Sequence, residues 1–299
     1  MKGSYGGGLR RWPCAIAFGV LMFLIPRTSF GGPYTIAGPP ASLTNSGWDW
    51  DSSNLADFRG ALSNAANFGP GGTVSTSIAI QFLSDYSNLS GVNAIIAPWW
   101  PNSAMTVTTL NQITTYFQHG GNLLLYQDDP THDPVGAALG LPTVAQSGTP
   151  WTITPPFSNG PFGSATSIGT GGNYGYFNAS DIAAKNAIVA GTDPGSLPTV
   201  AYWTPGLYCP TCGAMLLVGD IDTISTAYGQ ADYAGMNQNA KFALNSIAWL
   251  VNHSGTYSPA GTQPTTSSPE PGTFLLLASG LLTLALWRRP QKSGSGSVK

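Results

Sequence analysis

Glutamate and basic residues are nearly absent from most of this 299-residue chain. Its single glutamate, Glu270, lies near the carboxyl end, so the span between Pro33 and Ser268 has none. That span contains twelve aspartates but only Arg59, Lys185 and Lys241 as basic residues, which gives it a net charge of −9. Because nucleic-acid surfaces need clustered lysine and arginine, we expect no nucleic-acid partner.

Long hydrophobic runs are also lacking. A helix that crosses the ~30 Å core of a bilayer needs ~20 apolar residues. The run at Cys14–Ile25 is only about 12 residues long, and Phe274–Trp287 has 14. Two arginines precede the first run and small residues follow it, which is the order of a secretory signal peptide. We therefore predict that residues 1–32 direct export.

The second run lies in an ordered series of segments. A linker rich in Ser, Thr and Pro covers residues 256–268, and its part from Gly261 to Ser268 has no core-forming side chains. The short apolar run follows, a basic cluster ends it, and residues 290–299 form a polar tail. The residues that mark the entry and the end of the run are Pro269, Glu270, Pro271, Gly272, Arg288 and Arg289.

This order closely resembles the PEP-CTERM sorting signal of Gram-negative bacteria, over residues 269–289. The resemblance implies recognition by the membrane protease-transpeptidase exosortase, after passage through the secretion machinery and the inner membrane. It also implies transient membrane association through a short transmembrane helix, and a cell-surface or extracellular-matrix destination. Exopolysaccharide or other matrix components would then be partners. The tail 290–299 departs from the usual ending, and the alternative is a permanent single-pass anchor.

The body, residues 33–255, alternates strands with helices. Apolar and β-branched segments predict strands, and stripes of apolar residues at helical spacing predict helices. The predicted strands are Val74–Leu83, Ala94–Ala97, Leu123–Tyr126 and Ala214–Val218. The predicted helices are Asn54–Phe68, Met236–Asn252 and a third one between them, which Thr106 or Thr108 caps and which ends at His119. Such alternation predicts a doubly wound, mostly parallel α/β sheet. A Gly/Pro-rich stretch, about 143–176, is expected to be an irregular insertion.

Three segments of the body carry a further resemblance. They read APWWPNSAMTVTTLNQITTYFQHGGNLLLYQDD, MLLVGDIDTIS and AKFALNSIAWLVNH. Together they resemble the class I glutamine-amidotransferase-like superfamily, and especially its ThuA-like branch, over about residues 34–253. The resemblance implies a flavodoxin-like fold. An active amidotransferase would need a cysteine after the strand Leu123–Tyr126 and a later His-x-Glu pair. Gln127 follows that strand and the body has no glutamate, so the triad is absent.

Two aspartate-rich loops follow predicted strands, where ligand sites of α/β sheets lie. In the first, Asp128, Asp129, His132 and Asp133 could bind a metal ion or serve as acid and base. The alternative is a solvated loop whose Asp and Pro form turns and cap a short helix. The second loop contains Asp220 and Asp222.

If their two strands are neighbours, these loops converge and could hold a cation, Ca²⁺ or Zn²⁺. The alternative for Asp220 and Asp222 is again a polar loop. No cofactor is otherwise expected.

Cys209 and Cys212 form a C-x-x-C motif, which is typical of a redox pair or half of a zinc site. The body has no second cysteine pair, and the motif leads into a predicted strand, whereas redox enzymes continue into a helix. We therefore expect a small disulfide at a hairpin turn.

The sequence thus favours a surface-sorted protein whose degenerate α/β domain binds a ligand or has a structural role, and that is not an enzyme. The alternative is a metal-dependent hydrolase or carbohydrate-active enzyme that uses Asp128, Asp129 and His132.

Overall fold

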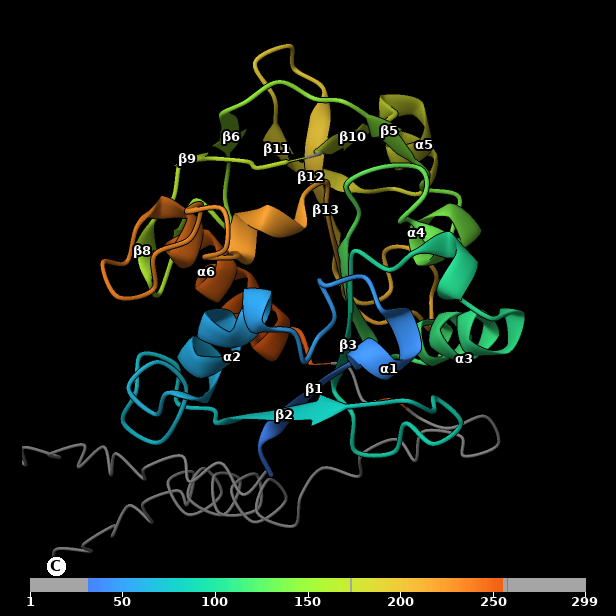
Figure 1. The fold of residues 1–299 in the computed structure, drawn as a ribbon, viewed down its shortest axis with the longest axis horizontal. Helices are drawn as coiled ribbons and strands as arrows, with labels where there is room; N and C mark the ends of the chain where they lie inside the picture. Colours follow the sequence, from blue (N-terminus) through green and yellow to red (C-terminus); the bar gives the residue numbers. More distant parts are fainter. Residues whose placement is uncertain (1–31, 173, 255–256, 258–299) are drawn as a thin grey trace, which may run out of the picture. The chain divides into compact units, whose positions relative to one another are not determined.

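The fold is built around a nine-stranded sheet. The computed structural model describes residues 32–172, 174–254 and 257. The chain divides into two units, Met1–Gly32 and Pro33–Lys299, and the sheet belongs to the second. Its strand order is β2-β1-β3-β4-β13-β12-β11-β6-β9 (Figure 1).

Five neighbouring strands form a parallel half of this sheet. They are β2 (Ile78–Phe82), β1 (Tyr34–Gly38), β3 (Ala94–Pro98), β4 (Asn122–Tyr126) and β13 (Met215–Val218). Every side chain of β3, β4 and β13 is buried. Unbroken apolar sequence is what parallel strands require when helices cover both faces. The predicted strands at these three positions are therefore confirmed within a residue or so.

Four antiparallel strands extend the sheet beyond β13. They are β12 (Pro198–Trp203), β11 (Ile188–Thr192), β6 (Trp151–Ile153) and β9 (Ser167–Ile168). The predicted α/β class is confirmed, but the sheet is mixed rather than mostly parallel throughout. The reason lies in the connection of β11 to β12, a tight turn in which Asp193 accepts a hydrogen bond from the Leu197 amide. Antiparallel strands need only such a hairpin and no crossover helix.

Helices cover the two faces of the sheet (Figure 1). The helices α2 (Ala56–Ser63) and α6 (Gln238–Asn252) contribute to the hydrophobic core on one face. On the other face the core includes side chains of α3 (Val107–Gln118), α4 (Pro134–Ala138) and α5 (Ala179–Ala184). Each large apolar side chain buried in these layers stabilises the fold by about 1.5–3 kcal/mol.

The ends of the helices follow local rules. The Thr106 hydroxyl caps α3 by accepting a hydrogen bond from the Thr109 amide, as predicted. Asn237 caps α6 in the same way. Helix α2 is shorter than the predicted Asn54–Phe68, because Asn64 adopts an extended backbone and accepts a hydrogen bond from the Ala66 amide instead.

Short elements complete the fold. The segment 143–176 contains two small antiparallel pairs, β5 with β10 and β7 with β8, besides β6 and β9 of the main sheet. The bounds of the remaining elements are Ala41–Thr44 (α1), Thr143–Ala145 (β5), Asn159–Gly160 (β7), Gly163–Ser164 (β8), Gly175–Phe177 (β10), and the 3₁₀ turns Ser53–Leu55 (η1), Asn102–Ala104 (η2) and Ile221–Ile224 (η3).

The structure corrects the expected C-terminal transmembrane helix and the membrane anchoring that depends on it. Among the helices of the described residues, none combines the length and apolarity needed to cross a membrane. The physical reason is already visible in the sequence, since the 14 residues of Phe274–Trp287 fall short of the ~20 that a bilayer requires. Residues 1–31 of the predicted signal peptide (1–32) and the whole predicted sorting segment (269–289) lie outside the described residues.

Candidate functional site at the carboxyl edge of the sheet

The two aspartate-rich loops leave the same edge of the sheet. Strand β4 pairs with β13 on one side and β3 on the other, with Tyr126 opposite both Val218 and Pro98. The loops that begin at Gln127 and Gly219 therefore start side by side. This is the strand adjacency on which the expected convergence of the loops depends.

Three aspartates from these loops form a buried cluster, here called the floor cluster: Asp128, Asp220 and Asp222. Asp128 Oδ1 accepts a hydrogen bond of 2.8 Å from the Ile221 amide. Asp220 Oδ1 accepts one of 2.7 Å from the Asp222 amide, and its Oδ2 accepts one of 3.0 Å from the Gly171 amide. Asp222 Oδ1 is buried and has no partner among the described residues. The cluster therefore binds the two loops to each other.

Burial makes the floor cluster hard to ionise. It raises the pKa of both Asp128 and Asp220 well above the usual value for aspartate, and the charges of neighbouring aspartates raise it further. Burial also raises the pKa of Asp222, to about 6. Burial and mutual repulsion therefore favour the neutral form of Asp128 and Asp220, whereas Asp222 has a pKa of about 6.

A glycine-rich loop packs closely against this cluster. A β-carbon placed on Gly171 would lie 2.8 Å from Asp222 Oδ2, closer than real contacts allow, and Gly172 has a φ of +59°. The missing side chain of Gly171 permits the close approach to Asp222, and glycine at position 172 permits the left-handed conformation. The insertion thus supplies part of the wall of the site.

A second arrangement lies beside the floor cluster. Asp129 Oδ1 accepts hydrogen bonds from the amide and hydroxyl of Thr131, at 2.7 and 2.5 Å. His132 Nδ1 lies 3.1 and 3.0 Å from the two Asp129 oxygens. Burial alone would raise the pKa of Asp129, but these hydrogen bonds and the nearby imidazole lower it below the usual value. Asp129 therefore orients the ring of His132.

Trp99 follows β3 and packs on that ring. The two rings are nearly parallel, with centroids 3.7 Å apart and an interplanar angle of 11°. Trp99 has a φ of +32°, which is unusual for a bulky residue and marks local strain. Such strain occurs where the surroundings fix a side chain in one position. The Trp99 amide donates to the Tyr126 carbonyl, which fixes the residue to the end of β4.

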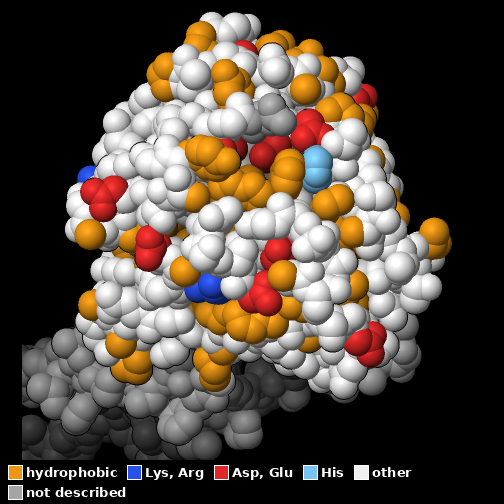
Figure 2. Space-filling view, viewed as in Figure 1, with side chains coloured by type: hydrophobic (Ala, Val, Ile, Leu, Met, Phe, Trp, Pro, Cys, Tyr) orange, Lys and Arg blue, Asp and Glu red, His pale blue; other side chains and the backbone are white. Residues whose placement is uncertain are grey.

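A second aromatic pair spans the site. Trp48 lies in the loop after β1 and Tyr228 in the loop after β13, and their rings stack with centroids 5.7 Å apart. Strands β1 and β13 are separated in the sheet by β3 and β4. The Trp48–Tyr228 contact must therefore bridge the width of these two strands. Figure 2 shows acidic, histidine and hydrophobic side chains around a hollow near the middle of one face.

Asp133 is not part of either arrangement. Its Oδ2 accepts a hydrogen bond from the Thr143 amide, and the side chain of Asn102 donates to its Oδ1. It therefore connects the loop after β4 to β5 and to η2, and it has a structural role. Among the described residues, no group of three or more His, Cys, Asp or Glu side chains is arranged to hold a metal ion.

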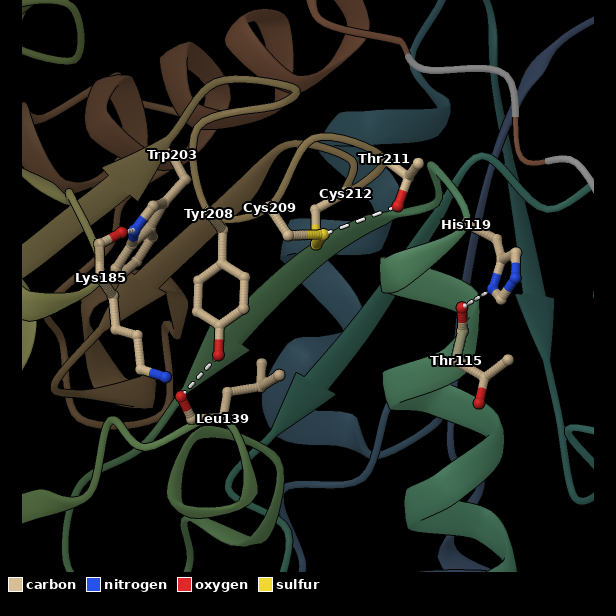
Figure 3. Close-up of a disulfide and its surroundings, with 9 residues drawn as sticks. All are labelled: Thr115, His119, Leu139, Lys185, Trp203, Tyr208, Cys209, Thr211 and Cys212. Carbon is tan, nitrogen blue, oxygen red and sulfur yellow. Dashed lines mark hydrogen bonds between the residues drawn. A yellow bond between two sulfur atoms is a disulfide. The ribbon is translucent and has the colours of Figure 1, made fainter.

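The predicted cysteine pair lies elsewhere (Figure 3). Cys209 and Cys212 form a disulfide in the turn that precedes β13. Next to it, the Tyr208 hydroxyl donates to the Leu139 carbonyl, and the Lys185 ammonium lies over the Tyr208 ring. The disulfide therefore closes the turn itself, Tyr208 connects the turn to the end of α4, and both lie before β13 and not at its carboxyl end.

Sequence reasoning missed the aromatic pairs and Gly171 as parts of the site. Tryptophans near predicted loops were noticeable, but nothing in the sequence shows which of them meet. The available signal was Pro98-Trp99-Trp100-Pro101 at the end of a buried strand, because two prolines restrict the backbone around two large aromatic residues.

Comparison with known proteins gives similarity at the level of the fold. No protein-family model matches the sequence, and no curated protein matches it. Solved structures that resemble this chain include the mmIFT52 N-terminal domain, with 12% identity, a TM-score of 0.51, and coverage of 73% of this chain and 96% of that one.

Two further structures are a putative ThuA-like protein from Bacteroides uniformis and an exo-beta-1,4-mannosidase from Opitutaceae bacterium strain TAV5. The ThuA-like protein has 15% identity and a TM-score of 0.45, over 76% of this chain and 95% of that one. The mannosidase has 15% identity and a TM-score of 0.47, over 76% of this chain and 37% of its own. At these identities the likeness to known structures extends to the α/β fold alone.

Proposed function

We propose that this domain binds a saccharide at the carboxyl edge of β3, β4 and β13. The observation that carries the proposal is the position of Trp99, stacked on His132 at the end of β3, at the same edge of the sheet as the buried carboxyls that follow β4 and β13. The apolar faces of sugar rings stack on aromatic side chains, and carboxylates accept hydrogen bonds from hydroxyl groups. Ligand sites of α/β sheets also lie at this edge.

A binding role is favoured over amidotransferase chemistry. The position after β4 that would need a cysteine nucleophile is occupied by Gln127, and the body has no glutamate. The Gln127 side chain packs against Gly136 of α4. The five parallel strands lie in the order β2-β1-β3-β4-β13. If β13 is counted as the fifth parallel strand, this is the order 2-1-3-4-5 of flavodoxin-like sheets, which supports assigning the domain to a degenerate branch of the amidotransferase-like fold.

The proposed ligand fits one of the expected partners. A binding component of an extracellular matrix would meet exopolysaccharide, and an acidic domain favours a neutral or cationic polymer over an anionic one. The expected recognition by exosortase depends on residues 269–289, which lie outside the described residues, and it stays a prediction.

The test is a binding measurement with a panel of neutral and amino-bearing oligosaccharides. Calorimetry should detect binding to the full chain, and Trp99→Ala should weaken it at least tenfold. Phe82→Ala is the matched control, because Phe82 is an exposed aromatic residue on β2, which β1 separates from β3. Equal loss in both variants, or no binding by any saccharide, would refute the proposal.

The same samples test the enzymatic alternative. The His132–Asp129 pair is the observation that favours it, because a carboxylate that orients an imidazole is a common general-base arrangement. Release of new reducing ends from a bound oligosaccharide, lost in His132→Ala, would establish hydrolysis. Unchanged oligosaccharide after long incubation is the outcome that a binding role predicts.

A further inference from the structure

We propose that the saccharide carries a primary amine, and that this amine binds against Asp222 at the floor of the site. The proposal rests on the saccharide-binding function above and specifies its ligand class. It follows from three observations: no basic side chain pairs with the floor cluster among the described residues, Asp222 Oδ1 has no partner there, and Trp99 lies at the same edge of the sheet.

No cationic side chain accompanies the floor cluster. Asp128, Asp220 and Asp222 come from the ends of two adjacent strands, and in the described part of the chain no Lys or Arg forms an ion pair with them. The three basic residues of the body lie elsewhere. Arg59 donates to the Trp50, Asp51 and Ser52 carbonyls, Lys185 lies over Tyr208, and the Lys241 side chain lies near Gly163.

A buried carboxylate without a counter-charge is costly, because neither water nor a cation compensates the lost hydration. The His132 side chain contacts Asp129, with Nδ1 3.0 Å from Asp129 Oδ2. The ligand is therefore the natural source of positive charge.

The unsatisfied atoms point to a hydrogen-bond donor. Asp222 is only 3% exposed, and its Oδ1 has no partner among the described residues. Backbone amides already occupy Asp128 Oδ1 and both oxygens of Asp220. An ammonium group supplies three donors and one charge, so it can satisfy Asp222 and reach a neighbouring carboxyl. A neutral hydroxyl supplies one donor and no charge.

The arrangement fits an ammonium group better than a metal ion. The described residues contain no group of three or more side chains arranged to hold a metal. His132 covers one face of the Trp99 ring, and the opposite face of an indole attracts organic cations as well as the apolar face of a sugar. An amino sugar combines both features in one molecule.

The titration of Asp222 supports this geometry. Its pKa is raised to about 6, and the charged or titratable groups around it are Asp128 and Asp220 in the cluster and Asp129 with His132 beside it. An ammonium group near Asp222 would favour its ionised form. Binding of the amine should therefore release protons near pH 6, whereas binding of a neutral sugar should not.

The experiment compares short oligosaccharides of glucosamine, N-acetylglucosamine and glucose with the same linkage, measured by calorimetry on the full chain near pH 6. We expect the glucosamine oligomer to bind at least tenfold more tightly than the other two. Asp222→Asn should abolish that preference. Asp85→Asn removes the same formal charge at an exposed site and should leave the preference and all three affinities unchanged.

The possible results separate the two proposals. If the three oligomers bind equally well and Trp99→Ala still weakens binding, the amine is wrong and the saccharide site stands. If no oligomer binds, the saccharide site itself is wrong. Calorimetry of the wild type in two buffers of different ionisation enthalpy gives a readout that needs no variant. Proton release with the glucosamine oligomer alone supports the proposal, and its absence overturns it.

Discussion

The floor cluster and the Asp129–His132 pair lie at the same edge of the sheet but behave in opposite ways. The pKa values of Asp128, Asp220 and Asp222 are raised, whereas the pKa of Asp129 is lowered. In the cluster, burial and mutual repulsion outweigh the few backbone donors. At Asp129, two donors from Thr131 and the imidazole of His132 outweigh burial. Donors and counter-charge, rather than depth alone, therefore decide which carboxyl is ionised.

The largest expected effect comes from removing Asp220. Asp220→Ala leaves the amides of Gly171 and Asp222 buried without an acceptor, so we expect a loss of about 2–4 kcal/mol in the free energy of unfolding. Asp232→Ala is the control, because Asp232 also accepts from two backbone amides but is exposed. Denaturant unfolding measures both. Similar losses in the two variants would mean that burial does not distinguish the floor cluster.

A smaller effect concerns pH. The pKa of Asp222 is about 6 in the folded protein and near its ordinary value of 3.8 in the unfolded chain. The folded state therefore binds more protons between these values, and its stability should fall as the pH rises from about 4 through 6. Asp222→Asn should flatten this decline and raise the melting temperature near pH 8.

Thermal unfolding from about pH 4 to pH 8 checks this. Asp85→Asn serves again as the control, because the exposed Asp85 has a lowered pKa and should leave the decline unchanged. A wild-type protein that becomes steadily more stable over this range would contradict the account of the floor cluster.

The smallest expected effect is at Asp129. The lowered pKa of Asp129 stabilises the fold above the unfolded value of 3.8, and this stabilisation is lost as the pH falls through the folded value. Because the group is partly exposed, Asp129→Asn should cost only about 0.5–1 kcal/mol at neutral pH and less in acid. Asp85 accepts from the Ser87 amide and hydroxyl as Asp129 does from Thr131, but Asp85 has no histidine. A cost equal to that of Asp85→Asn would show that His132 contributes nothing.

The pattern of apolar residues along the chain predicted the helices that bury one apolar face and the strands that consist of a short apolar run. The helices α3 and α6 and the strands β3, β4 and β13 were found within one or two residues, because their periodicity and caps are written in adjacent residues. No strand was predicted at β11 or β12. Their pairing depends on the turn at Asp193 and on β13, which lies farther along the chain.

The candidate site was predicted in part. The aspartates stood out because they follow buried strands, but the sequence left open whether the strands were neighbours. It also treated Asp133 together with Asp128 and Asp129, although Asp133 contacts Asn102 and Thr143 instead. Pro98 and Pro101 drew attention to Trp99, but no local pattern marked Tyr228 or showed which rings stack, because stacking partners from distant loops are set by topology.

The sequence by itself determined that the domain is α/β, that it lacks an amidotransferase triad, and that its acidic residues end two buried strands. Those properties depend on residue types and on spacing along the chain. Only the tertiary structure decided that β4 and β13 are adjacent, that Gly171 approaches the carboxylates, and that two aromatic pairs flank them. The physical reason is that pKa, burial and stacking depend on distances in space, which sequence separation does not give.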